Sequence, residues 1–306
     1  MPTFSPKQTW GMVLFLVLVW GINWPLTKMA LPHTPPLLFS GLRTLIGGLI
    51  LLPFALRRIS AFRWTQNAGP YLLLALLNVV GYYGLQTIGI GYLPAGLFST
   101  LVFLQPILLG IFSRLWLGES LNRFKTAGLV LGFAGVAVIS LGGLEGHLSP
   151  LGIALALASA LCWALGTVYM KKQGPRLDSI WAVTLQLLLG GFVLLLLGSG
   201  TESWSAIVWS PSFILILLFI SVFVIAGGWM IYFLLIDAGE VSTVGAYTFL
   251  IPVLSNGFSI ALLGESATAT LLIGLLMIAG SIRLVNRRKS PLPEPAAEGS
   301  SIARRL

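Results

Sequence analysis

One segment occurs twice in the sequence: LQPILLGIFSRLWLGES at residues 104–120 and LIPVLSNGFSIALLGES at residues 250–266. Aligned without gaps, both copies begin Leu-x-Pro, share Phe-Ser in the middle and end in Leu-Gly-Glu-Ser. Further matches lie on either side: Gly128-Leu129 with Gly274-Leu275, Trp20 with Trp163, Lys28 with Lys171 and Pro32 with Pro175. Leucine-rich helices match by chance, but a shared Leu-Gly-Glu-Ser at a fixed distance from a proline does not easily arise that way. The sequence therefore predicts an internal repeat.

Composition places this repeat in a membrane. Hydrophobic residues make up 57% of the chain and charged residues 9%, and the mean hydropathy is +0.94. A soluble domain carries roughly a quarter charged residues, so most of this surface is expected to face lipid. The net charge of +9 does not indicate nucleic-acid binding, because the basic residues form short clusters between apolar runs rather than one patch. The single cysteine, Cys162, cannot form an internal disulfide and is interpreted as a small buried hydrophobe.

A membrane helix needs about 20 mostly apolar residues. On that basis we expect ten, at residues 10–31, 36–56, 71–90, 94–117, 125–142, 151–172, 179–198, 213–236, 241–263 and 270–285. The first is interpreted as a retained helix, because it is longer than the apolar part of a typical signal peptide and no A-x-A-like site follows it. The tail at 287–306 is rich in Pro, Ala, Glu, Ser and Arg and is expected to be disordered.

Orientation follows from the lysines and arginines. With ten helices both termini lie on one side, and that side holds 16 of the 18 basic residues. They are Lys7, Arg57, Arg58, Arg63, Arg114, Arg123, Lys125, Lys171, Lys172, Arg176, Arg283, Arg287, Arg288, Lys289, Arg304 and Arg305. Because cytoplasmic loops carry such an excess, both termini are predicted to be cytoplasmic. No transit-peptide pattern appears, which favours insertion into a bacterial inner (plasma) membrane.

The repeat divides the chain into a first unit at 8–143 and a second at 150–286, each with five helices. Five is odd, so the second unit is expected to be inserted upside down relative to the first. Inverted-topology repeats are typical of secondary transporters, whose substrate site lies near the membrane midplane between the repeats. The expected fold class is therefore an all-α integral membrane protein of two five-helix inverted repeats.

The proline followed by Gly-Glu at the end of each fourth helix, with a Gly-rich fifth helix after it, resembles the EamA domain. Two such domains in ten helices are similar to the drug/metabolite transporter superfamily, and the start Trp20-Gly21-Ile22-Asn23-Trp24-Pro25 resembles its first helix. Within the superfamily the chain looks most like the YddG-type exporters of aromatic amino acids. This resemblance implies export of amino acids or related metabolites.

Candidate binding residues are the polar and aromatic side chains expected near the midplane. They are Trp20, Asn23, Trp24, Arg43, Asn78, Tyr82, Gln86, Phe98, Ser99, Trp163 and Tyr247. Asn78, Tyr82 and Gln86 recur at four-residue spacing and should share one helix face turned away from lipid. The aromatic residues have a second interpretation as plain helix packing. Arg43 either contacts an anionic group of the substrate or extends its charge to the membrane surface, and the same two alternatives apply to Lys28.

No Asp or Glu is expected near the middle of a helix, which favours facilitated transport or exchange over proton or sodium coupling. Pro106 and Pro252, near mid-helix, are either paired hinges or static kinks. Gly128, Gly132 and Gly135 are expected to allow close helix packing.

An intramembrane enzyme is the alternative class. It would need acid clusters, a metal site or a nucleophile with a base, and no such motif occurs in an expected membrane segment. Neither cofactor nor metal is therefore predicted. The expected partners are a small-molecule substrate and the lipid bilayer, without nucleic acid, in a monomer or weak homodimer. Export of other amphipathic metabolites or drugs remains open beside export of amino acids.

Overall fold

The structure, a computed structural model, describes residues 4–93, 98, 101–141, 149–174, 176–263 and 269–286. Over these ranges the chain is helical and has no β-strand. Six helices here are long and apolar enough to cross a membrane: Pro6–His33, Pro36–Leu56, Trp64–Gly89, Pro150–Gln173, Ser179–Thr201 and Pro211–Ala238. Shorter apolar helices lie at Val241–Ser255 and Leu272–Val285. The expected all-helical membrane fold is confirmed, while the tail at 287–306 and Ser99 lie outside the described residues.

Helices are named in chain order. They are α1 (Pro6–Ala30), α2 (Pro36–Leu56), α3 (Trp64–Ala75), α4 (Leu85–Gly89), α6 (Gln105–Leu117), α7 (Arg123–Leu141), α8 (Pro150–Gln173), α9 (Ser179–Thr201), α10 (Pro211–Phe219), α11 (Trp229–Ala238), α12 (Val241–Tyr247), α13 (Leu250–Leu263) and α14 (Ala269–Val285). Short 3-10 turns occur at η1 (Leu31–His33), η2 (Ile59–Ala61) and η4 (Trp204–Ala206), and π-helical segments at η3 (Leu76–Gly84) and η5 (Ile220–Gly228).

Several helices begin earlier than hydropathy predicts, because proline and a capping serine start them. In α1, Pro6 follows Ser5, whose hydroxyl accepts a hydrogen bond from the backbone N–H of Gln8. The side-chain oxygen of Gln8 in turn accepts one from the backbone N–H of Ser5. Pro150 and Pro211 start α8 and α10 behind serine caps of the same kind. Proline suits the first turn of a helix because a backbone N–H at that position would have no partner within the helix in any case.

Two spans change helical period in the middle. The span Trp64–Gly89 runs through α3, η3 and α4, and the span Pro211–Ala238 runs through α10, η5 and α11. A π-helical turn is wider than an α-helical turn and often marks a functional position. These two spans are the third helix of each expected unit, so the feature occurs once in each.

The fourth helix of the second unit is a correction to the sequence prediction. Expected to be continuous over 241–263, it is divided at Thr248 and Phe249 into α12 and α13. Pro252 has no N–H to offer the Thr248 carbonyl, which accepts instead from Ile251, 3.0 Å away. In the first unit α6 begins at Gln105, so Pro106 also lies in a first turn rather than at a mid-helix kink.

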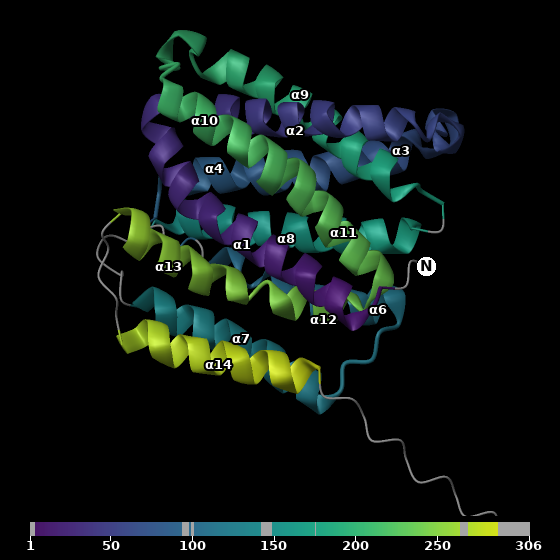
Figure 1. The fold of residues 1–306 in the computed structure, drawn as a ribbon, viewed down its shortest axis with the longest axis vertical. Helices are drawn as coiled ribbons and strands as arrows, with labels where there is room; N and C mark the ends of the chain where they lie inside the picture. Colours follow the sequence, from purple (N-terminus) through teal and green to yellow (C-terminus); the bar gives the residue numbers. More distant parts are fainter. Residues whose placement is uncertain are drawn as a thin grey trace, which may run out of the picture.

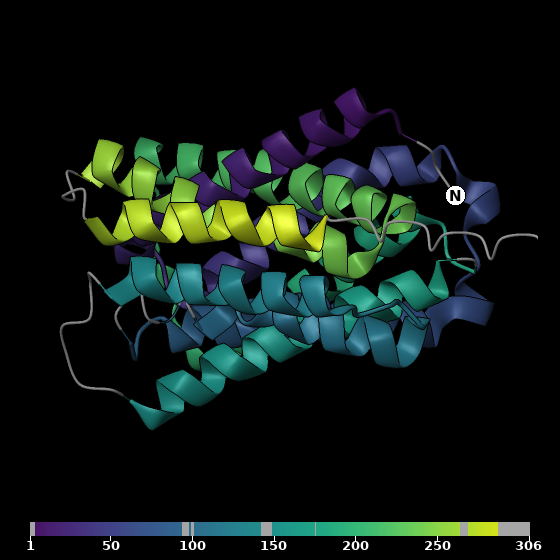
Figure 2. The same cartoon turned by 90° about the horizontal axis from the view of Figure 1, so that it is seen from below.

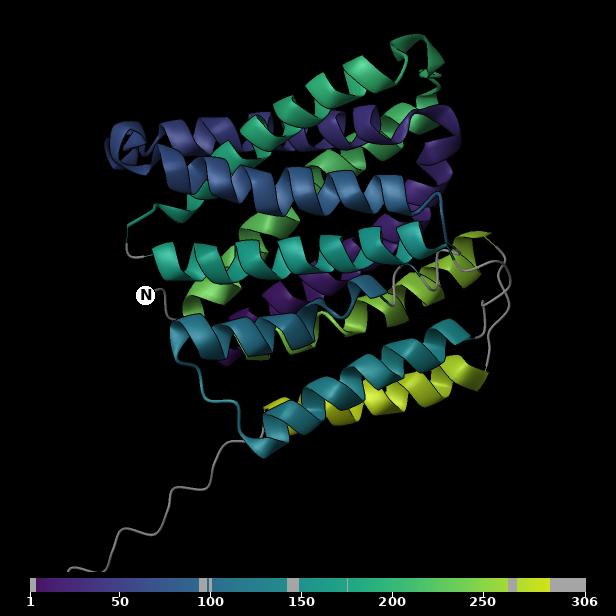
Figure 3. The same cartoon turned by 180° about the vertical axis from the view of Figure 1, so that it is seen from behind.

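Helices of the two units pack against each other in matching pairs. The helix α2 runs along α9 and α7 along α14, while α1 packs against α13 and η5, and α8 against α6 and η3. The pair α7 and α14 lies at one edge of the bundle, beside α12 and α13 (Figures 1 and 3). Seen from below, the long helices run side by side in roughly one direction (Figure 2).

Glycine brings α7 and α14 close together, as the sequence predicts. A Cβ added at Gly135 would lie 2.9 Å from the Gly274 carbonyl oxygen, and one at Gly128 would lie 2.7 Å from a Val285 methyl carbon. Both distances are too short for a real side-chain atom, so these positions need glycine for the observed contact.

The described acidic residues lie at helix ends. Glu119 accepts hydrogen bonds from the first turn of α12, at Val241 N (2.6 Å), Ser242 N (3.2 Å) and Ser242 Oγ (2.8 Å). Glu202 likewise accepts from the backbone of Leu37 and Leu38 at the start of α2. A carboxylate at a helix N-terminus satisfies free N–H groups and complements the helix dipole.

Candidate functional site

Side chains from four of the membrane spans, most of them aromatic, surround a cavity within the bundle. It is lined by Trp20, Asn23, Trp24, Tyr82, Tyr83, Phe103, Trp163, Val224 and Ile251. We call it the aromatic cavity. Phe103 and Ile251 lie at the two breaks near α6 and α13, and Tyr82 and Val224 lie in the π-helical segments η3 and η5. The two π-helical segments and the two helix breaks therefore meet at one place.

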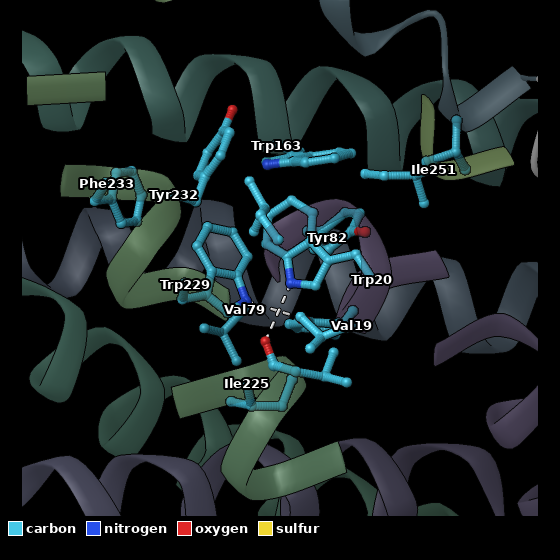
Figure 4. Close-up of a cluster of buried hydrophobic side chains, with 14 of the residues drawn as sticks. Val19, Trp20, Val79, Tyr82, Trp163, Ile225, Trp229, Tyr232, Phe233 and Ile251 are labelled. Carbon is cyan, nitrogen blue, oxygen red and sulfur yellow. Dashed lines mark hydrogen bonds between the residues drawn. The ribbon is translucent and has the colours of Figure 1, made fainter. Parts of the chain in front are cut away.

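The rings around the cavity contact one another (Figure 4). The Trp20 ring centroid lies 5.6 Å from that of Trp163, 5.9 Å from Trp229 and 5.2 Å from Tyr232. Tyr82 completes the cluster, with its centroid 4.9 Å from that of Trp163. These separations and the tilted or edge-to-face angles are those that aromatic pairs prefer. The cavity beside them has a volume of about 20 Å³, which is room for roughly one water molecule.

Side-chain hydrogen bonds join α1 and α8 to the two π-helical segments. The Trp20 indole N–H donates to the Val224 carbonyl in η5, 3.1 Å away. Across the cavity, the Ser159 hydroxyl donates to the Tyr82 carbonyl in η3, also 3.1 Å away. In both cases a side chain from the first helix of one unit bonds to the third helix of the other. The buried Trp163 indole nitrogen has no partner among the described atoms.

A second, smaller cavity adjoins the first. It is lined by Asn23, Trp24, Thr27, Gln86, Thr87 and Ile90 and has a volume of about 10 Å³. We call it the polar cavity, because two amides and two hydroxyl groups line it. Asn23 and Trp24 belong to both linings, so a single ligand could extend from one cavity into the other.

Arg43 lies directly behind these walls. Its side chain on α2 is 1% exposed, so it does not extend its charge to the membrane surface. One guanidinium nitrogen is 3.4 Å from the Thr27 hydroxyl, and the guanidinium carbon lies 4.6 Å from the centre of the Tyr83 ring. Thr27 lines the polar cavity and Tyr83 the aromatic cavity. Arg43 therefore touches the wall of each.

The remaining candidates lie elsewhere. Asn78 donates to Gln186, 2.9 Å away, and lines neither cavity. Phe98 is fully buried and lies against Gly89 of α4. Tyr247 lies near the chain ends, where its hydroxyl donates to Asn286 and its ring centroid is 5.6 Å from that of Trp10. Of the three residues expected to share a helix face, Tyr82 and Gln86 contact each other and line the two adjoining cavities, whereas Asn78 in η3 pairs with Gln186.

Sequence reasoning overlooked Thr27, Thr87 and Ser159. Thr27 follows Asn23 by four residues in α1, so helical spacing could have identified it. No sequence pattern indicates Ser159, because its role depends on the backbone carbonyl of Tyr82 in η3, to which its hydroxyl donates. No cluster of three or more potential metal ligands occurs within the residues searched in this structure.

The apolar helical spans place the chain among membrane-spanning helical proteins. The EamA-like transporter family model matches residues 9–141 and 150–287, and the chain belongs to this family. It is therefore a multi-pass membrane protein, and its bacterial relatives include transporters named for the inner membrane.

Relatives cover nearly the whole chain. An "uncharacterized transporter YvbV" of Bacillus subtilis (strain 168) is 58% identical, with 96% of each chain covered. A "probable amino-acid metabolite efflux pump" of Salmonella typhimurium (strain LT2) is 30% identical, covering 89% of this chain and 92% of its own. A solved crystal structure with 20% identity superposes with a TM-score of 0.79, covering 92% of this chain and 97% of the other, and supports the fold alone.

Proposed function

We propose that this transporter exports amino acids, aromatic ones and other neutral ones such as threonine, or related metabolites. Transport proceeds by alternating access through the aromatic cavity. The observation that carries the proposal is the ring cluster of Trp20, Tyr82 and Trp163 beside a cavity where both family segments meet. Uncharged hydrogen-bonding groups with aromatic walls suit an apolar-bodied solute. A relative named as an amino-acid metabolite efflux pump supports the same substrate class.

The proposed architecture is ten membrane helices in two inverted five-helix repeats, 8–143 and 150–286, with both termini in the cytoplasm. The two units make equivalent contacts. The helix α1 of the first unit packs against α13 of the second, and its counterpart α8 packs against α6, the counterpart of α13. Two units related as an inverted repeat are expected to pack in this way. Trp10, Tyr247 and Asn286 lie in one cluster, so the two described chain ends share one end of the bundle. The breaks before Pro106 and Pro252 are the proposed bending points.

Within the proposal, transport needs no proton or sodium gradient, or proceeds by exchange. Neither cavity has an Asp or Glu in its lining. The described carboxylates are engaged at helix ends, as at Glu119 and Glu202. Proton relays and cation-coupled carriers usually place an ionisable group within the membrane.

The test is uptake of labelled tryptophan, phenylalanine and threonine into proteoliposomes, with and without a proton or sodium gradient at zero membrane potential. We expect movement of at least the aromatic amino acids at rates that the gradient does not change. Acceleration by either gradient would contradict uncoupled transport. No movement of any amino acid would reject the substrate class, though not the family.

Substitution tests the site. Tyr82→Ala and Trp163→Ala should each reduce the affinity for tryptophan about tenfold, because each removes a ring contact that a bound aromatic body would make. Trp209→Ala is the matched control, since Trp209 is 53% exposed and far from the cavity lining. Unchanged affinity and selectivity in both cavity variants would place the binding site elsewhere.

A further inference from the structure

Arg43 is a buried charge with weak partners. Its two terminal nitrogens lie 3.4 Å from the Thr27 hydroxyl and 3.5 Å from the Ser40 hydroxyl, at the outer limit of hydrogen bonding. Its Nε is buried and has no partner among the described atoms. The rings of Phe39 and Tyr83 supply cation–π contacts at 4.9 and 4.6 Å. These contacts hold the guanidinium in place, but all of them come from neutral groups, so none neutralises its charge.

No described carboxylate reaches this charge. Residues 1–118, which include every helix of the first unit up to Gly118, contain no Asp or Glu. The acids that the structure describes have other partners, at helix ends or in surface pairs: Glu119 with Ser242, Asp178 with Arg58, Glu202 with Leu37, Asp237 with Ser179 and Glu240 with Lys125. Burying an unpaired charge costs free energy of folding, so a fold alone has no reason to place arginine here.

The two cavities show where a counter-charge would fit. The polar cavity has neutral walls, and its Thr27 hydroxyl is the group nearest to the guanidinium. Its other walls include Asn23 and Gln86, which can donate hydrogen bonds to an anion. The aromatic cavity, which shares Asn23 and Trp24, offers ring surface instead. The groups that can bind an anion beside Arg43 therefore lie in the polar cavity, and the aromatic cavity provides an apolar enclosure next to it.

We infer that Arg43 is the anion-recognition group of this transporter, and that the substrates are carboxylates with an apolar body. The carboxylate enters the polar cavity against Thr27 and Arg43, and the body lies among the rings of the aromatic cavity. Arginine suits this role because its planar fork matches a carboxylate and stays charged when buried. This inference rests on the proposed function and deepens it.

A second consequence concerns the amino group. Since neither cavity lining contains a carboxylate, nothing there pairs with an ammonium. An acid that lacks the amine should therefore be recognised about as well as the amino acid, and an amine that lacks the acid should not.

The experiment compares three ligands of one skeleton: phenylalanine, 3-phenylpropionate and 2-phenylethylamine. Affinities are measured by ligand-induced thermal stabilisation of the purified full-length protein, which does not require transport. We expect the two acids to bind within about threefold of each other and the amine at least about tenfold more weakly, the worth of one charge-assisted contact. Comparable binding of the amine, or no binding of either acid, would overturn the inference.

Variants then assign the effect to Arg43. Arg43→Met should weaken binding of both acids at least about tenfold, leave the amine unchanged, and melt without ligand at or above the wild-type temperature. Arg43→Lys should bind the acids with an affinity between those of the wild type and Arg43→Met, because lysine keeps the charge but lacks the planar guanidinium fork. Arg58→Met is the control, since Arg58 is half exposed and paired with Asp178. Unchanged acid affinity in Arg43→Met would refute the assignment. The three-ligand comparison of the wild type remains decisive if a variant fails to fold.

Failure of the inference and failure of the proposed function are distinguishable. If labelled phenylalanine moves across proteoliposomes but the amine binds as well as the acids, the export proposal stands and the role of Arg43 is rejected. If the acids bind selectively but no amino acid moves, Arg43 recognises carboxylates and the transported species is another acid.

Discussion

The contact between Glu119 and α12 supports the sharpest stability prediction. Glu119 follows Gly118, whose φ of +70° ends α6 in the left-handed conformation that glycine tolerates. The carboxylate then accepts three hydrogen bonds from Val241 and Ser242 at the start of α12. One side chain thereby joins the fourth helices of the two units. Removing it should weaken the docking of α12 on α6.

The magnitude follows from the number of bonds and their exposure. A hydrogen bond to a charged group contributes about 1.5–3 kcal/mol when buried, and a favourable charge at a helix N-terminus adds about 0.3–1 kcal/mol. Glu119 is only partly buried, so these contributions do not simply add. We expect Glu119→Ala to lower the free energy of unfolding by about 2–4 kcal/mol, and Glu119→Gln, which keeps one acceptor oxygen, by about 1–2 kcal/mol.

The assay is denaturant unfolding of the purified protein in mixed micelles, followed by tryptophan fluorescence. Arg58→Gln is the control, because it removes the ion pair between Arg58 and Asp178. The Arg58 side chain is exposed, and such a surface pair contributes about 0.2–1 kcal/mol. The expected order of stability is wild type, then Arg58→Gln and Glu119→Gln, then Glu119→Ala. Wild-type stability in both Glu119 variants would show that the carboxylate does not hold α12, and the reasoning would fail.

Two further predictions use the same unfolding assay. Lys171 donates to three carbonyls at the end of α11, so Lys171→Met should lower the free energy of unfolding by about 1–2 kcal/mol. The control Lys172→Met changes an exposed position and should leave that free energy unchanged; equal effects of the two variants would contradict the prediction. A Cβ at Gly132 would lie 2.4 Å from the Phe249 ring, so Gly132→Ala should cost about 1–3 kcal/mol. The control Gly11→Ala meets nothing within 4 Å and should be neutral or slightly stabilising; a similar loss there would reject the packing explanation.

Hydropathy and turn residues were enough to predict the spans, because lipid imposes a length and a composition on a helix regardless of its neighbours. The start of α2 at Pro36 and its end at Leu56 agree with the prediction to the residue. The division between α12 and α13 was missed, since Thr248 and Phe249 carry no helix-breaking signal. It depends on Pro252, three and four residues later, which the sequence predicts to be either a hinge or a static kink near mid-helix.

Much of the cavity lining could be predicted as deep polar and aromatic side chains, including Tyr82 in η3 and Trp163 in α8. Trp20, Asn23 and Trp24 lie in α1, and the structure places all three around the aromatic cavity. In η3 the wider turn directs Asn78 towards Gln186 and Tyr82 towards the cavity. Nothing in the residue types announces a π-helical segment, so the sequence alone could not separate these two roles. Tyr247, expected at the midplane, is the last residue of α12 and lies beside Trp10, outside both cavity linings.

The small size of the cavities bears on how transport works. Volumes of about 20 and 10 Å³ hold about one water molecule each, whereas a site for a small organic ligand encloses roughly 300–1,000 Å³. Binding therefore requires rings to separate, and the contact between Trp20 and Trp163 is one that joins the two units at the cavity. Trp20 is bonded to η5 and packs with α1, while Trp163 belongs to α8, which packs with η3 and α6. Separating these rings thus moves two groups of helices, each drawn from both units. A substrate ring inserted between them would replace the ring contacts that opening breaks, each worth about 0.5–1.5 kcal/mol. An aromatic body thereby offsets part of the cost of opening, which gives a physical reason for a carrier with this cavity to favour aromatic solutes.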